Sequence, residues 1–223
     1  MPDGSYRPDW RQVERAFADV FDGKAAESKA IFDVDVVPSD GRAPYGLSIK
    51  TSLRKPDGRV LLELNNSPAK MLAFALESGL AIDVGGGRGQ WDCSVEEMGH
   101  SVINAVKSWH EACASTHDLD GSCYVVMTHD RKKEQYQILQ FELDIGEPAD
   151  LDWSERGKAI IGYEPDSAVV RWEYYAGSGG QLKWYPDSAD AVWTSELFGL
   201  PDPSKTVSLS DKAREMFSED WPS

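Results

Sequence analysis

Three apolar runs near the start of the chain alternate with polar residues, and this pattern restricts the segment to a β-meander. In the first run, 30–37, apolar residues alternate with Asp33 and Asp35. The runs 47–53 and 60–65 alternate in the same way. Because successive side chains of a strand point to opposite faces of its sheet, each run has an apolar and a polar face. The three runs are predicted to form adjacent strands.

The turn between the second and third runs sets the predicted register. Asp57-Gly58 favours a type I′ hairpin turn. A two-residue turn there puts Lys50 opposite Asn65 and Ser52 opposite Glu63. The apolar residues of both strands then share the core side of the sheet: Leu47, Ile49, Leu53, Val60, Leu62 and Leu64.

Helices are predicted on both sides of the meander. Residues 8–21 carry apolar groups at helical spacing, and Ser67-Pro68 is typical of a helix start that leads to about residue 78. The strongest pattern is 94–113, where Ser94 and Glu97 form a capping box. Its spacing predicts that His100 and His110 lie away from the apolar stripe.

The second half of the chain is predicted to be richer in strands. The whole pattern indicates a mixed α/β fold, with a central mixed sheet, an antiparallel meander flanked by helices, and further hairpins in the second half. One domain, 1–223, is expected, with a core-like half at 1–118, a β-rich half at 119–200 and a polar tail at 201–223. The tail is predicted to hold one short helix near 210–217. The strands of the second half are expected at 123–129, 135–143, 169–175 and 181–185.

Charge and composition narrow the function classes. The 38 Asp and Glu against 23 Lys and Arg give a formal net charge of −15, and such a surface repels nucleic acid on average. The three cysteines have no CxxC spacing, so reduced thiols in the cytoplasm are expected. No secretory leader and no apolar run of membrane-spanning length is recognised, so no membrane association is predicted.

The polar face of the meander is the candidate site. Asp33 and Asp35 share one face of the first strand, and this face is expected to join that of Lys50 and Glu63. Carboxylates suit Mg²⁺ or Mn²⁺, and a lysine beside them can orient water and neutralise charge in phosphodiester hydrolysis. The other interpretation of these residues is a set of cross-strand salt bridges on a solvated face.

These residues resemble the PD-(D/E)XK nucleases, a family that includes many restriction endonucleases. The resemblance covers about the first half of the chain and consists of a helix, an aspartate on a strand (Asp33 or Asp35), and Ser48-Ile49-Lys50 where the family has (D/E)-X-K. It implies a restriction endonuclease-like core and a type II, Mg²⁺- or Mn²⁺-dependent enzyme that cuts double-stranded DNA, with homodimerisation as a further expectation.

The resemblance also implies roles for single residues. Lys50 would assist the attacking water, while the acidic pair of Asp33 or Asp35 with Glu63 would hold the metal. Ser48 departs from the family's acidic position, which Glu63 would supply from the next strand. Ser48, Glu27 and Glu14 are supporting candidates.

Two glycine-containing segments add candidate DNA contacts. Arg88 lies in the glycine loop 85–89 and Gln90 follows it, while Gln181 and Lys183 follow the glycine turn 177–180. An ordinary surface loop at the first segment and a structural hairpin at the second are the favoured interpretations. The alternative to a nuclease is a non-enzymatic acidic interaction protein, of the immunity or DNA-mimic type, and the net charge favours that alternative.

Overall fold

The structure is a computed structural model that describes residues 10–25, 31–55, 57–65, 67–85, 88–130, 133–175 and 180–199. Within these ranges it has three α-helices, α1 (Trp10–Val20), α2 (Pro68–Glu77) and α3 (Val95–Ala112). Two 3-10 turns are η1 (Pro148–Asp150) and η2 (Ser188–Asp190). The strands are β1 (Lys24–Ala25), β2 (Val34–Val36), β3 (Tyr45–Leu53), β4 (Leu62–Asn65), β5 (Ala81–Gly85), β6 (Arg88–Trp91), β7 (Cys123–His129), β8 (Tyr136–Glu142), β9 (Asp152–Arg156), β10 (Ala159–Tyr163), β11 (Val170–Tyr174), β12 (Leu182–Trp184) and β13 (Trp193–Thr194).

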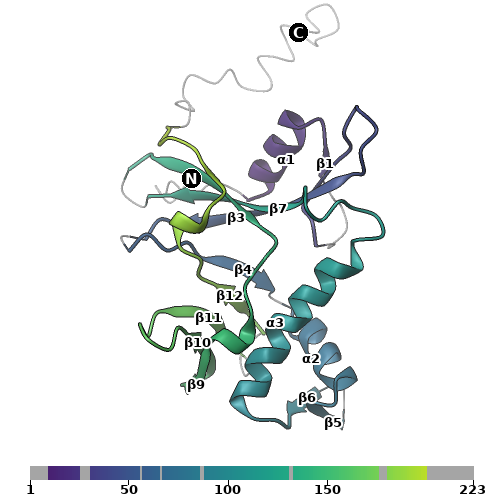
Figure 1. Ribbon diagram of the computed structural model, residues 1–223, viewed down its shortest axis with the longest axis vertical. Helices are drawn as coiled ribbons and strands as arrows, with labels where there is room; N and C mark the ends of the chain where they lie inside the picture. The colour runs from purple at the N-terminus through teal and green to yellow at the C-terminus, as the bar shows by residue number, and fades with distance from the viewer. Residues whose placement is uncertain are drawn as a thin grey trace, which may run out of the picture.

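The strands form two large sheets and one ribbon. The six-stranded sheet has the order β1-β2-β3-β7-β8-β13, and the five-stranded sheet has the order β4-β12-β11-β10-β9. Strands β3 and β7 are parallel, whereas all other neighbours in both sheets are antiparallel. Strands β5 and β6 pair as a separate ribbon beside α2 (Figure 1).

Each face of the six-stranded sheet has its own apolar cluster. Helix α1 covers part of one face, where the apolar cluster includes residues of β2, β3 and β7. The opposite face packs against α2, α3 and the five-stranded sheet, and this is the larger cluster. Every residue of β7 is buried, as expected for a strand that has apolar groups packed on both of its faces.

Helix α3 is the element that the sequence predicts best. Ser94 Oγ accepts the backbone N–H of Glu97, and the Glu97 carboxylate accepts the N–H of Ser94, so the predicted capping box is confirmed. The prediction for His110 is wrong, because this residue is 6% exposed and lies on the buried side of the helix with Val106. Its position four residues after Val106 places the two on the same face.

The predicted hairpin between β3 and β4 is wrong. Gly58 has the positive φ expected of a turn residue, at 77°, but β4 pairs with β12, and Glu63 lies opposite Lys183. Both edges of β3 are already occupied, by β2 and by the parallel strand β7. A local turn pattern therefore gave the wrong partner, because non-local pairing decided the register.

The predicted common core side for β3 and β4 is wrong for the same reason. Leu47 and Ile49 pack under α1, whereas Val60 and Leu62 lie in the cluster on the other side of the six-stranded sheet. The polar residues of β3 face inward: Ser48 is 2% exposed and Ser52 is 3% exposed. This polar face lines the interior between the two sheets and α3.

The mixed α/β class with a mixed multi-stranded sheet and flanking helices is confirmed. The strands expected in the second half are present, and the structure adds the β9-β10 hairpin, which turns at Gly157 (φ 66°). None of the helices in the described part of the chain combines the length and apolar character needed to span a membrane. The helix expected near 210–217 lies outside the described residues.

Gly99 allows α3 to approach the indole of Trp153. A Cβ atom at Gly99 would lie 2.2 Å from the ring, and the indole N–H is fixed by a 3.2 Å bond to the carbonyl oxygen of Pro148. We expect Gly99→Ala to lower the free energy of unfolding by about 1–3 kcal/mol, although alanine normally favours a helix. Urea unfolding measures this change. Asn104→Ala, on the exposed side of α3, is the control and should leave stability unchanged or slightly raised.

Candidate functional site

The predicted pair of Asp33 and Lys50 is in contact. Lys50 Nζ lies 3.0 Å from Asp33 Oδ2, and the same oxygen accepts the backbone N–H of Ile49 at 2.7 Å. Ser48 Oγ is 3.5 Å from it. The side chains of Lys50 and Asp33 are 21% and 26% exposed, so the pair is partly shielded from water. Neighbouring strands thus position one carboxylate and one ammonium group at the mouth of a small polar pocket.

That pocket, of about 110 Å³, lies between β3 and the helices. Its wall includes His110 of α3, whose Nε2 is 2.8 Å from the hydroxyl oxygen of Tyr124 on β7. Burial lowers the pKa of His110 to about 4 and raises the pKa of Tyr124. Both groups are therefore neutral near pH 7. Sequence reasoning missed this pair, although the spacing of His110 from Val106 was a usable signal.

The other predicted carboxylates do not reach Lys50. Asp35 Oδ1 lies 3.1 Å from Nε2 of His117. Glu63 is exposed on the five-stranded sheet, with its Oε1 3.5 Å from Nε2 of Gln181. Its neighbour Leu64 lines the pocket, so Glu63 points away from it.

These residues do not fit a divalent metal centre. Such a centre needs several oxygen ligands around one point, and here Asp33 is the one predicted carboxylate ligand at Lys50. Among the residues that the structure describes, no group of three or more His, Cys, Asp or Glu side chains could hold a metal ion. The structure brings Asp33 and Lys50 together, but it does not bring Asp35 or Glu63 to them.

The supporting candidates are dispersed. Ser48 lines the pocket, while Glu14 belongs to α1, on the opposite face of the six-stranded sheet. Glu27 and the side chain of Arg88 lie outside what the structure describes. Gln90 is exposed on the β5-β6 ribbon.

Lys183, the last candidate DNA contact, is held within the five-stranded sheet. Its Nζ lies 3.9 Å from Glu173 Oε2 and 4.4 Å from the ring centroid of Tyr175. These groups come from β12, β11 and the end of β11, away from the pocket that Lys50 lines. The four candidate DNA contacts therefore belong to separate elements. Arg88 and Gln90 are part of β6, whereas Lys183 is part of β12 and Gln181 directly precedes that strand.

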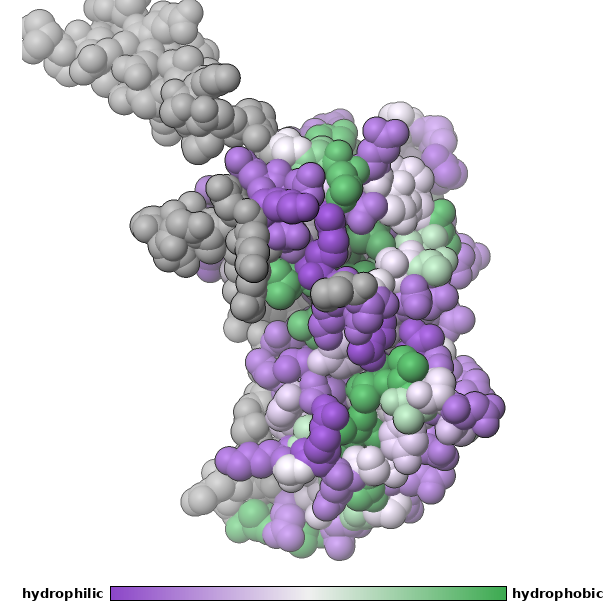
Figure 2. All heavy atoms as spheres, turned by 90° about the vertical axis from the view of Figure 1, so that its left-hand side faces the viewer, coloured by the Kyte–Doolittle hydropathy of each residue, from purple (hydrophilic) through white to green (hydrophobic). Residues whose placement is uncertain are grey.

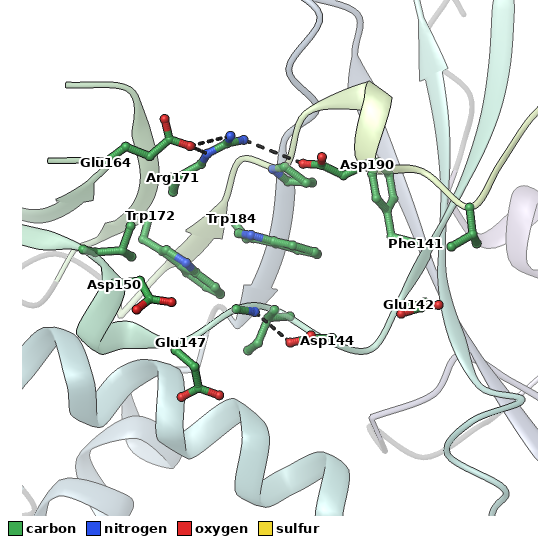
Figure 3. Close-up of a pocket in the computed structure, with 15 residues that line it drawn as sticks. Phe141, Glu142, Asp144, Glu147, Asp150, Glu164, Arg171, Trp172, Trp184 and Asp190 are labelled. Atoms are coloured by element: carbon green, nitrogen blue, oxygen red, sulfur yellow. Dashed lines mark hydrogen bonds and ion pairs between the residues drawn. The ribbon is translucent and has the colours of Figure 1, made fainter. Parts of the chain in front are cut away.

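A larger cleft, of about 440 Å³, opens between the two sheets, and no sequence pattern pointed to it. Figure 3 shows Trp172 and Trp184 side by side in the cleft, with Arg171 on one side of them and Asp150 on the other. The tryptophan rings are stacked with centroids 5.9 Å apart. The cleft is lined by six carboxylates and one guanidinium: Glu142, Asp144, Glu147, Asp150, Glu164, Asp190 and Arg171.

The charges of this acidic cleft are unbalanced. Arg171 is bound by Glu164, with 2.6 Å between Nε and Oε1, and lies 3.9 Å from Asp190. Hydrogen bonds from Ser167 and Arg171 lower the pKa of Glu164. Lys107 of α3 pairs with Glu147 at the rim.

Three carboxylates of the acidic cleft remain without a cationic partner in the described part of the chain: Glu142, Asp144 and Asp150. A cluster of like charges around a concave surface raises the local negative potential. The acidic cleft therefore favours a cationic group as its occupant.

Comparisons of the chain with protein-family models, curated proteins and solved structures give no match. The chemistry of the described residues is therefore the basis for assigning a function.

Burial of His110 gives a testable pH dependence. The unfolded chain takes up a proton on this histidine near pH 6.5, whereas the folded chain resists protonation until about pH 4. Stability should therefore be full above pH 6.5 and should fall by up to about 3 kcal/mol as the pH drops from 6.5 to 4. Urea unfolding of the wild type and His110→Gln across this range measures the effect. The carboxylates titrate in both proteins, so an equal pH slope in the two would contradict this contribution.

Proposed function

We propose that this protein is a non-enzymatic acidic interaction protein, of the immunity or DNA-mimic type, that binds a basic protein partner. The observation that carries the proposal is the acidic cleft, in which six carboxylates face one guanidinium. A lysine or arginine side chain of the partner would meet carboxylates that have no cation of their own.

The charge of the whole chain supports this proposal. A net charge of −15 attracts basic proteins over long range and speeds their encounter. The face seen in Figure 2 is mainly hydrophilic, and its apolar groups lie in separate patches. Such a surface suits a partner that is recognised by its charge, and the acidic cleft would be the site at which this partner binds.

The binding test uses simple cationic probes. Titration calorimetry with oligolysine and oligoarginine peptides should show binding that weakens as salt is added, since exposed charges are screened over about 10 Å at 0.1 M salt. An oligoglutamate peptide should not bind. Absence of binding to both cationic peptides at low salt would overturn the proposal.

A metal-dependent DNA endonuclease is the second candidate. The Asp33–Lys50 contact favours it. In this candidate Lys50 would act on the attacking water. Among the described residues Asp33 is the one carboxylate paired with Lys50, and this is the reason for placing the nuclease second.

Plasmid DNA separates the two candidates. Incubation with Mg²⁺ or Mn²⁺ should leave the plasmid intact if the protein is an interaction protein. Cleavage that Lys50→Ala abolishes would establish the nuclease instead. Lys70→Ala, a second lysine at the same pocket, is the matched control for a general loss of positive charge.

A further inference from the structure

Helix α1 covers only part of its face of the six-stranded sheet. Strands lie about 4.8 Å apart, so six strands are about 24 Å wide, whereas a helix is about 10 Å across. Helix α1 packs beside β1, β2 and β3. The neighbouring part of the same face, formed by β7, β8 and β13, is left as an open groove beside α1.

This groove is apolar and holds about 530 Å³. Its α1 side includes Phe17 and Val20, and its sheet side includes Met127, Ile138 and Trp193. Val20 is 78% exposed, Trp193 52% and Phe21 44%. A contiguous exposed apolar surface of this kind indicates that something covers it.

The described chain ends at the rim of the groove. Phe198 lines the groove, its ring lies 6.0 Å from that of Tyr136, and its backbone is hydrogen-bonded to the same residue. Another 24 residues, 200–223, follow Gly199. The C-terminal segment therefore begins at the rim of the groove.

The C-terminal segment has the pattern of an amphipathic helix. Five apolar residues recur at steps of three, four and one, which places them on one helical face. Ser208 and Asp211 are spaced as a capping box, and Pro222 is a typical stop. The apolar residues are Leu209, Ala213, Met216, Phe217 and Trp221.

We propose that residues 209–221 form a helix that docks into the groove beside α1. The nine residues 200–208 reach at most about 30 Å, enough to begin at Phe198 and return along the groove. A short tether holds the segment at millimolar effective concentration, so a modest intrinsic affinity is sufficient. Two helices would then cover this face of the sheet, and this inference is independent of the proposed function.

A truncated chain provides the first test. A protein ending at Gly199 should bind a synthetic peptide of residues 204–223, whereas the full chain, whose groove is filled, should not. Met216→Asp with Phe217→Asp in the peptide should weaken binding roughly 100-fold, because two apolar side chains lose their burial. Ser218→Asp, which adds one negative charge off the apolar face, should bind as the unchanged peptide does.

The full chain provides the second test, which does not depend on the truncated protein folding. Met216→Asp with Phe217→Asp should lower the melting temperature and increase the fluorescence of an apolar dye, and Ser218→Asp should do neither. Equal peptide binding by full and truncated chains would overturn the proposal. So would a dimer of the full chain that Phe21→Asp converts to a monomer, since a second copy would then fill the groove.

Discussion

Trp172→Ala is expected to lower the free energy of unfolding by about 3–5 kcal/mol, a large part of the stability of an ordinary domain. Trp172 is 2% exposed and pairs with Trp184 across β11 and β12. Trp184 in turn contacts Phe141 and Tyr124 of the six-stranded sheet, with ring centroids 6.1 Å and 5.9 Å away. The substitution would leave a cavity at the junction of the two sheets.

Urea unfolding measures the loss for Trp172→Ala. Trp10→Ala is the control, because Trp10 is 51% exposed, and its change should stay within about 0.5 kcal/mol. Similar losses for the two variants would mean that the aromatic stack does not join the sheets. Trp172 also lines the acidic cleft, so Trp172→Ala is expected to weaken binding of cationic peptides there.

Neutralising three carboxylates of the acidic cleft is expected to weaken binding of oligolysine roughly 10- to 100-fold. Each exposed ion pair contributes about 0.2–1 kcal/mol, and three neighbouring pairs act on the same ligand. The variant is Glu142→Gln with Asp144→Asn and Asp150→Asn, the three carboxylates that have no cationic partner in the described part of the chain. The amide oxygen at position 144 can still accept the N–H of Gly146, which Asp144 now accepts at 2.9 Å. Calorimetry at low and at physiological salt measures the change.

A matched variant separates the cleft from net charge. Glu111→Gln with Asp120→Asn and Glu134→Gln removes the same three charges at exposed positions away from the acidic cleft. Its affinity for oligolysine should fall by less than about threefold, because distant exposed charges are screened. Equal losses in the two variants would show that the peptide senses only total charge, and the cleft would then have no special role.

The sequence predicts those elements whose signals are local. Ser94 and Glu97 cap α3 as expected, and the β11-β12 hairpin forms where its glycine turn lies. The partner of β4 was not predictable in this way, because β12 lies more than a hundred residues further along the chain. Alternation says which side chains share a face of a strand but not which strand comes next to it.

The candidate sites show the same division. Alternation predicts that Asp33 and Lys50 lie on the same face of the sheet, and the structure brings them together. Glu63 was assigned to the same site through a hairpin that does not form. The acidic cleft collects residues from the end of β8, η1, β11 and η2, and no single segment of the sequence contains a pattern for it.

The parallel pairing of β3 and β7 affects the order of events during synthesis. Leu47 pairs with Cys123, and the buried N–H of Gly46 is bonded to Ser122 Oγ, 76 residues later. Until the ribosome has released β7, one edge of β3 has no strand to pair with, and an unpaired edge is a site of aggregation. Closing so long a loop also costs entropy before any contact repays it, which slows folding. Strand β3 is therefore synthesised early but pairs with its second neighbour, β7, only late.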